Sequence, residues 1–316
     1  MKKIFVKIVI LGVILIITGF VGDIITTAGL MKTGDFYSNG AEEYTTWNEI
    51  ISSNIEADLI INGNSRAYKH VNPFILDEIL NLKTYNIGMS GGSIEKQYIR
   101  YLTFEKYNEK PKYIIQEVDF WTLEISNSVD DRILPYIPYL AGKEYLNKKY
   151  KNNSYLHFYR YMKRYDFIIR GFLEFFNIKH FPEVRKRGFF ETDLQWNSYE
   201  FSQIIKGDSL ISKKQNEAIE VFDNYLLHCK KNNIQVILVI SPVYYKATKF
   251  FKDSNELLDL YRSYSEKYNI PFFDYSNDTI CYDTTYFYNA MHLNKKGSEL
   301  YSIKLAQDID LFLKIK

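Results

Sequence analysis

The chain has 316 residues, of which 46% are hydrophobic and 25% charged, so it can form one large globular domain with additional segments. Lys and Arg number 40 and Asp and Glu 38, and the formal net charge of +2 gives no case for nucleic acid as a partner. The two cysteines, Cys229 and Cys281, lack the spacing of a metal site. We expect two free thiols, although an exported location would permit a disulfide.

The N-terminal segment is apolar. Two lysines precede a run from Ile4 to Gly22 that only Lys7 interrupts. About 20 apolar residues cross a bilayer as a helix, and a lysine near one end can reach the headgroups. The leading lysines favour a cytoplasmic N-terminus and an extracytoplasmic body. A cleaved signal peptide has the same charged start, but only the stretch 27–29 resembles a cleavage site, so we favour an uncleaved anchor over residues 1–25.

Strands and helices alternate in the rest of the chain. We expect residues 26–55 to form a stalk and entry segment, and residues 56–316 to form an α/β/α domain. Short apolar runs predict its strands, and apolar residues at spacings of three and four predict its helices. The predicted strands are 58–62, 84–87, 112–118, 235–240 and 271–273; the predicted helices are 73–82, one opening at Ser93, 213–232, 254–268 and 296–313. This alternation predicts three layers around a mostly parallel sheet.

The alternation is interrupted between residues 125 and 210. This stretch is rich in Tyr, Phe, Lys and Arg, and we expect a helical insertion. A long insertion in a regular fold is usually functional, so we expect it to cover the site or to contact a partner.

Polar and small residues follow the predicted strands at their carboxyl ends. These residues are Ser65, Gly88, Asp119, Ser241 and Asp274. Ligands bind outside the carboxyl ends of parallel strands, so the site is expected at this edge. A serine needs a base to take its proton before it can act as a nucleophile, and His292 in a distant loop could be that base.

Three blocks resemble the SGNH/GDSL hydrolase superfamily. They are Gly63-Asn64-Ser65-Arg66, Asn86-Ile87-Gly88-Met89-Ser90-Gly91-Gly92-Ser93, and His292-Leu293-Asn294-Lys295-Lys296-Gly297. The chain is similar to the membrane-anchored bacterial branch, which includes proteins that O-acetylate alginate and other exopolysaccharides and the D-alanyl transfer protein of teichoic acids. The resemblance covers roughly residues 55–122 and 233–315 and implies a flavodoxin-like α/β/α fold.

The resemblance also implies roles for single residues. Ser65 would be the nucleophile and His292 its general base, then the acid that protonates the leaving group. The backbone N–H groups of Ser65 and of a glycine in the second block would bind the oxyanion. We favour Gly91 over Gly88 because Gly91 precedes the helix that Ser93 opens.

The chain departs from the family pattern in three places. Asn64 replaces the aspartate of the first block, which is a mild change because this residue carries no proton. Asp119 lies where the family supplies an oxyanion-binding asparagine. Asn289 replaces the aspartate three residues before the histidine; its amide oxygen can orient His292 without stabilising the imidazolium. Asp119 or Asp283 could supply that charge instead.

Other polar residues receive local interpretations. Arg66 is either a substrate anchor or the partner of a helix carboxylate. Asn294 is expected to cap the last helix. His70 is expected to be structural or on the surface. Three further histidines, at positions 157, 180 and 228, lack metal-ligand spacing, so we expect no metal and no cofactor.

The sequence therefore predicts a membrane-anchored enzyme on the extracytoplasmic side. We expect serine-dependent acyl transfer or deacylation (an O-acetyltransferase or an esterase) on a cell-surface or secreted glycan. A multi-pass membrane O-acyltransferase is the expected partner. The alternative is a catalytically idle glycan-binding or scaffold subunit, which the asparagine at position 289 favours.

Overall fold

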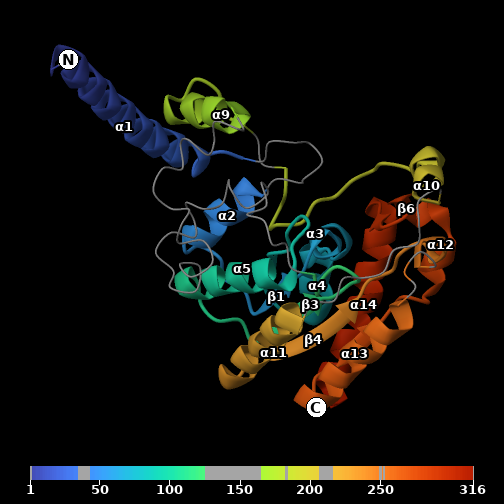
Figure 1. The fold of residues 1–316 in the computed structure, drawn as a ribbon. Helices are drawn as coiled ribbons and strands as arrows, with labels where there is room; N and C mark the ends of the chain where they lie inside the picture. The colour runs from blue at the N-terminus through green and yellow to red at the C-terminus, as the bar shows by residue number, and fades with distance from the viewer. Residues whose placement is uncertain are drawn as a thin grey trace. The chain divides into compact units, whose positions relative to one another are not determined.

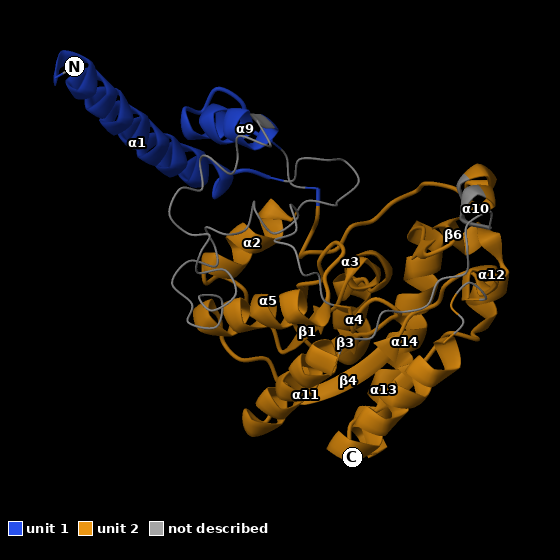
Figure 2. Cartoon of the chain, viewed as in Figure 1, with its two compact units in different colours: residues 1–38, 126–184 blue, residues 39–125, 185–316 orange. Residues whose placement is uncertain are grey.

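The structure is a computed structural model, and it describes residues 2–34, 43–124, 165–181, 184–205, 216–248, 251 and 253–315. The chain divides into two compact units (Figure 2). One comprises residues 1–38 and 126–184, and the other residues 39–125 and 185–316.

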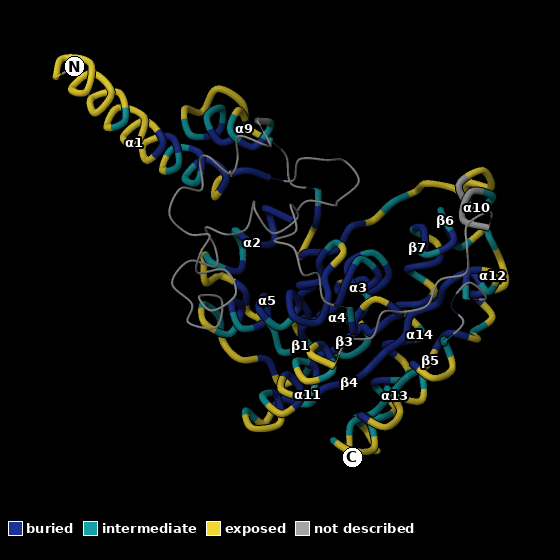
Figure 3. The backbone as a smooth tube through the Cα atoms, in the orientation of Figure 1, coloured by how far each residue is buried: buried dark blue, intermediate teal, exposed yellow. Residues whose placement is uncertain are grey.

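The first unit contains helices α1 (Lys2–Leu30) and α9 (Tyr165–Phe175). In the described part of the chain, α1 is the single helix long and apolar enough to cross a membrane. Its first two thirds are mostly exposed (Figure 3). The two helices touch through backbone, because a Cβ on Gly29 would lie 1.8 Å from the carbonyl oxygen of Gly171.

A five-stranded sheet forms the centre of the second unit (Figure 1). Its strands are β1 (Leu59–Asn62), β2 (Thr84–Asn86), β3 (Tyr113–Glu117), β4 (Gln235–Ile240) and β5 (Phe272–Asp274). The order is β2-β1-β3-β4-β5, and every neighbouring pair is parallel. The parallel sheet predicted from the sequence is confirmed.

Helices cover both faces of this sheet. They are α2 (Tyr44–Ile51), α3 (Ser65–His70), α4 (Pro73–Leu80), α5 (Ile94–Tyr107), α10 (Ser198–Ile205), α11 (Asn216–Lys231), α12 (Tyr245–Thr248), α13 (Ser254–Tyr268) and α14 (Lys295–Ile315). Successive strand residues point to opposite faces, so Ile60 packs with α5, α11 and α13 while Ile61 packs with α3, α4 and α14. The α/β/α layering is confirmed by these two cores.

Local sequence sets several helix boundaries. Pro73 occupies the first turn of α4, and the Asn72 side chain accepts a hydrogen bond from the N–H of Phe74. Asn81 ends α4 and Asn269 ends α13, each in the left-handed conformation that asparagine tolerates.

A short hairpin precedes α14. Two 3₁₀ turns, η3 (Thr279–Tyr282) and η4 (Thr284–Tyr286), lead into the antiparallel strands β6 (Phe287–Asn289) and β7 (His292–Leu293). The side chain of Asn294 accepts from the N–H of Gly297, as expected of a helix cap.

Several predicted boundaries can be compared with the described elements. α1 continues past residue 25, and α2 lies in the stretch 26–55, where it contributes Ile50 to the core. Of the insertion at 125–210, α9 and α10 are described, whereas residues 125–164, 182–183 and 206–210 lie outside the described residues. Cys229 and Cys281 are both buried free thiols.

Candidate active site

Ser65 begins α3 directly after β1, where the sheet order changes direction between β1 and β3. Gly63 makes the turn possible. It has φ +151°, and a Cβ there would lie 2.8 Å from the Cβ atoms of both Ala67 and Glu117. The Asn64 side chain then accepts from the N–H of Arg66 and caps α3. These contacts place Ser65 at the carboxyl edge of the sheet, as predicted.

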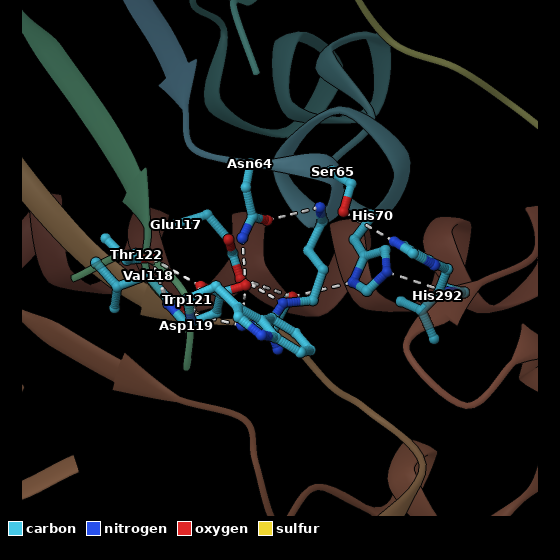
Figure 4. Close-up of polar contacts among 12 residues, drawn as sticks. Asn64, Ser65, His70, Glu117, Val118, Asp119, Trp121, Thr122 and His292 are labelled. Atoms are coloured by element: carbon cyan, nitrogen blue, oxygen red, sulfur yellow. Dashed lines mark hydrogen bonds and ion pairs between the residues drawn. The ribbon is translucent and has the colours of Figure 1, made fainter. Parts of the chain in front are cut away.

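Ser65 and His292 meet at this edge (Figure 4). The Ser65 hydroxyl oxygen lies 2.9 Å from Nε2 of His292. On the other side of the ring, Nδ1 of His292 lies 3.1 Å from Oδ1 of Asn289. The structure thus brings together the three residues to which the sequence analysis assigns the catalytic roles.

The contacts of Asn289 define which nitrogen of His292 carries the proton. Oδ1 of Asn289 accepts from the backbone N–H of Met291 at 3.0 Å and of His292 at 2.9 Å, so this atom is the oxygen of the amide. Nδ1 must then donate to it, which leaves the lone pair of Nε2 facing the Ser65 hydroxyl. This is the tautomer that a general base requires.

The surroundings of His292 disfavour its charged form. Burial, and then the positive charges of Lys69 and Arg66, lower the pKa of His292 well below its usual value. The ring is therefore neutral at pH 7 and can accept a proton from Ser65.

Two of the three predicted oxyanion donors are free. Among the described residues, neither the backbone N–H of Ser65 nor that of Gly91 has a hydrogen-bond acceptor. The prediction for Gly88 is wrong, because its N–H donates to Oδ1 of Asn86 at 2.9 Å. Asn86 is two residues earlier in the chain, and its side chain closes a local turn there.

Arg66 and Asp119 belong to a buried ionic cluster. Nε of Arg66 lies 3.1 Å from Oε1 of Glu117, and its Nη2 lies 3.4 Å from Oδ2 of Asp119. Arg66 is 1% exposed, so it pairs with carboxylates instead of offering its charge to a substrate. Asp119 also accepts from the Asn64 side chain and thereby holds the cap of α3.

The two carboxylates considered as charge donors to His292 are not in contact with it. Asp119 accepts from Asn64, from the hydroxyl of Thr122 and from the N–H of Trp121, while Asp283 is exposed and caps η4. Among the described residues no hydrogen bond or ion pair joins either carboxylate to His292. Asn289 is therefore its side-chain partner on the Nδ1 side.

His70 has a structural role, one of the two that the sequence analysis left open for it. It is fully buried, and its Nε2 accepts from the N–H of Leu293 at 3.1 Å, so its Nδ1 donates to the hydroxyl of Ser241 at 3.0 Å. Ser241 in turn donates to Glu117 at 3.1 Å. His70 thus fixes the backbone beside His292. Its position five residues after Ser65 was the only sequence signal. His157 lies outside the described residues.

Comparisons with known proteins give weak likenesses. No protein-family model matches the sequence, and no curated protein matches it. Among solved structures, a protein assigned to the G-D-S-L lipolytic family from Desulfitobacterium hafniense is 13% identical, with 79% of this chain and 97% of that chain covered and a TM-score of 0.39. A GDSL-like lipase from Bacteroides thetaiotaomicron is 11% identical, with 86% and 100% covered and a TM-score of 0.39. An acetyl xylan esterase from Butyrivibrio proteoclasticus is 10% identical, with 81% and 64% covered and a TM-score of 0.37.

Proposed function

We propose that the chain is a serine-dependent acyl hydrolase or acyltransferase of the SGNH/GDSL type. The observation that carries the proposal is the 2.9 Å contact between the Ser65 hydroxyl and Nε2 of His292, in the tautomer that accepts a proton. A hydroxyl in this contact becomes a nucleophile when the imidazole takes its proton.

The reaction follows from these groups. The Ser65 oxygen attacks the carbonyl carbon of an ester while His292 takes the hydroxyl proton. The N–H groups of Ser65 and Gly91 stabilise the oxyanion; one such donor contributes about 2.7–4 kcal/mol to lowering the barrier. The bond between the carbonyl carbon and the alcohol oxygen then breaks, and His292 protonates the leaving alcohol. Water or a second hydroxyl attacks the Ser65 ester, gives its proton to His292 and releases the serine.

The acceptor in the second step distinguishes hydrolysis from transfer. We propose a cell-surface or secreted glycan as the acylated molecule, because α1 would hold the body at a membrane. Transfer to a sugar hydroxyl would suit a donor handed over by a multi-pass membrane O-acyltransferase. Both the glycan and this partner come from the family resemblance.

A catalytically idle scaffold subunit is the second candidate. Asn289 supports it, since an amide orients His292 but places no negative charge beside the imidazolium that forms during attack. The same protein would then bind an acylated glycan without turning it over.

The test uses the full-length protein in detergent with 4-nitrophenyl acetate and a fluorescent fluorophosphonate. Wild type should release 4-nitrophenol and become labelled, and Ser65→Ala should lower kcat at least about a thousandfold and abolish labelling. His292→Gln should lose as much activity as Ser65→Ala, and the double variant no more than either, because the two residues act as a unit.

Ser90→Ala serves as a matched control, since it removes a hydroxyl from the second block and leaves Ser65 and His292 in place. If wild-type protein neither turns over the ester nor reacts at Ser65, the proposed enzymatic activity is refuted and the scaffold subunit is the remaining candidate.

A further inference from the structure

Helix α3 presents two side chains at the surface. Ser65 and Lys69 are half-buried, whereas the four other residues of the helix are buried. The two are four positions apart, and residues at this spacing lie on the same helix face with about 5–6 Å between their Cβ atoms. A molecule that reaches the Ser65 hydroxyl therefore meets Lys69 one turn further along.

Aromatic rings surround the Lys69 ammonium. Nζ lies 5.5, 5.4 and 5.2 Å from the ring centroids of Tyr68, Phe190 and Tyr288, respectively, and donates to the Tyr288 hydroxyl at 2.6 Å. Burial, and then the positive charge of Arg185, lower the pKa of Lys69 to about 8.

Lys69 has no acidic partner in the described part of the chain, since no salt bridge joins it to a carboxylate there. Three buried carboxylates pair with arginines instead: Glu117 and Asp119 lie beside Arg66, and Glu43 contacts Arg100 and Arg185. A partly desolvated cation with no counterion is costly to maintain for stability alone.

The positive charge of Lys69 also lowers the pKa of His292, the candidate base. The hydroxyl of Tyr288 accepts a hydrogen bond from Lys69, and the ring of Tyr288 stacks on the His292 ring, at 5.6 Å between centroids and 8° between planes. The other charge that disfavours the imidazolium is that of Arg66, and two carboxylates lie beside this arginine. The neighbouring His70 is neutral, because its Nε2 accepts a hydrogen bond from the N–H of Leu293. Asn289 supplies no charge. The imidazolium that forms during attack on the ester thus lacks an anionic partner within the described protein.

We propose that Lys69 and Tyr288 bind an anionic group of the substrate, a carboxylate or a phosphate a few bonds from the scissile ester. The inference rests on the proposed function and specifies its substrate class as an acidic acyl ester. The bound anion pairs with Lys69, cancels its effect on His292, and so provides the negative charge that Asn289 lacks. The enzyme then works best on esters that carry this group and poorly on neutral esters of the same size.

The test compares matched pairs of esters with full-length protein in detergent. The 4-nitrophenyl monoester of succinic acid is compared with 4-nitrophenyl butyrate, and acetylated glycerol 3-phosphate with acetylated glycerol. The first pair places the anion on the acyl side and the second on the alcohol side. In at least one pair, kcat/KM of the anionic ester should exceed that of the neutral ester by about ten- to a hundredfold, as expected for a hydrogen bond to a charged group.

Lys69→Gln should abolish this preference by lowering kcat/KM for the anionic ester alone. Lys69→Arg should keep part of it. Lys112→Gln is the matched control, because it removes the same charge from the opposite end of the sheet, where Lys112 pairs with Asp58. With neutral esters, Lys69→Gln should also move the acid limb of the pH profile to higher pH, since the pKa of His292 rises when the lysine charge is removed.

Two outcomes overturn the inference without touching the proposed function. One is Ser65-dependent hydrolysis in which kcat/KM is the same for the anionic and the neutral ester of each pair. The other is a Lys69→Gln variant that loses activity equally on both. Calorimetric titration with succinate and glycerol 3-phosphate provides a readout without turnover. Binding by wild type and Lys112→Gln, but not by Lys69→Gln, supports the site; absence of binding, or equal binding by all three, refutes it. Failure of every ester to react refutes the proposed function instead.

Discussion

At the scale of single residues, Asn289 orients the ring of His292, as the aspartate of a catalytic triad does, but it adds no negative charge. Its amide oxygen accepts from the N–H groups of Met291 and His292 and from Nδ1 of His292. In serine proteases, replacing the supporting aspartate by asparagine costs about 10⁴ in turnover because the wrong tautomer is held. Here the two backbone donors already fix the oxygen toward the ring, so the deficit is one of charge only.

We expect Asn289→Asp to raise kcat/KM on a neutral ester by about tenfold, the effect of about 1.4 kcal/mol in the barrier. An aspartate can accept the same three hydrogen bonds and adds a negative charge beside the imidazolium. That charge raises the pKa of His292, so the acid limb of the pH–rate profile should move to higher pH. Asn294→Asp is the control, because it adds the same charge at the cap of α14. Unchanged rate and unchanged profile would contradict this account of Asn289.

The sequence predicted the central residues because their contact depends on the topology of the fold. Ser65 follows a strand and His292 precedes a helix, and parallel strands bring such positions to one edge. Gly88 was predicted wrongly because a side chain two residues away competes for its N–H. Lys69 and Tyr288 were missed because burial and ring stacking depend on contacts between distant segments.

At the scale of elements, one hydrogen-bonded chain connects four of them. Leu293 in β7 donates to His70 in α3, His70 donates to Ser241 after β4, and Ser241 donates to Glu117 at the end of β3. Glu117 then contacts Arg66, the neighbour of the nucleophile. This series of hydrogen bonds connects the hairpin that carries His292 to the sheet and to the turn that carries Ser65.

The stability of this connection should depend on pH. Burial raises the pKa of Glu117 to about 7, against the smaller opposing effect of Arg66. The folded carboxyl keeps its proton to higher pH than the unfolded one, so its stabilising contribution is complete below pH 4.5 and is lost as pH rises through 7. We expect the free energy of unfolding of Glu117→Gln to gain up to about 3 kcal/mol relative to wild type between pH 4 and 8.

Guanidinium unfolding in detergent at several pH values measures this difference. Burial lowers the pKa values of His70 and His292, and these two groups favour the fold as pH rises through 6.5, so the comparison with Glu117→Gln is needed to isolate the carboxyl. Glu105→Gln, a half-buried glutamate on α5, is the control. A constant difference between wild type and Glu117→Gln at all pH values would contradict the raised pKa.

The elements themselves were largely predictable because β1, β3 and β4 each contain a short apolar run. Residues 235–240 are apolar after Gln235 and become β4, buried on both faces. The hairpin β6–β7 was not predicted, since its strands have three and two residues and lie in a stretch without apolar alternation. The register shifts between Phe287 and Asn289, and Asn289 pairs with His292 across the hairpin.

At the scale of the whole molecule, α1 is the feature that places the chain in the cell. We propose that it is an uncleaved anchor with the body on the extracytoplasmic side. We expect the full-length protein to stay with membranes after an alkaline carbonate wash and to have the mass of the intact chain. An alkaline phosphatase fused to the C-terminus should be active, because that enzyme folds only outside the cytoplasm. Release of a protein that lacks the first residues would indicate a cleaved signal peptide. An inactive fusion would indicate that the body lies on the cytoplasmic side.

The backbone contact between Gly29 and Gly171 bears on where α9 lies relative to the bilayer. A helix of 29 residues is about 44 Å long, whereas the hydrocarbon layer is about 30 Å thick. If α1 enters the bilayer from its first turn, its last turns emerge on the far side, and the crossing point with α9 emerges with them. Phe176 and Ile178, which are exposed just after α9, would then meet the interfacial layer, where amphipathic segments bury apolar side chains.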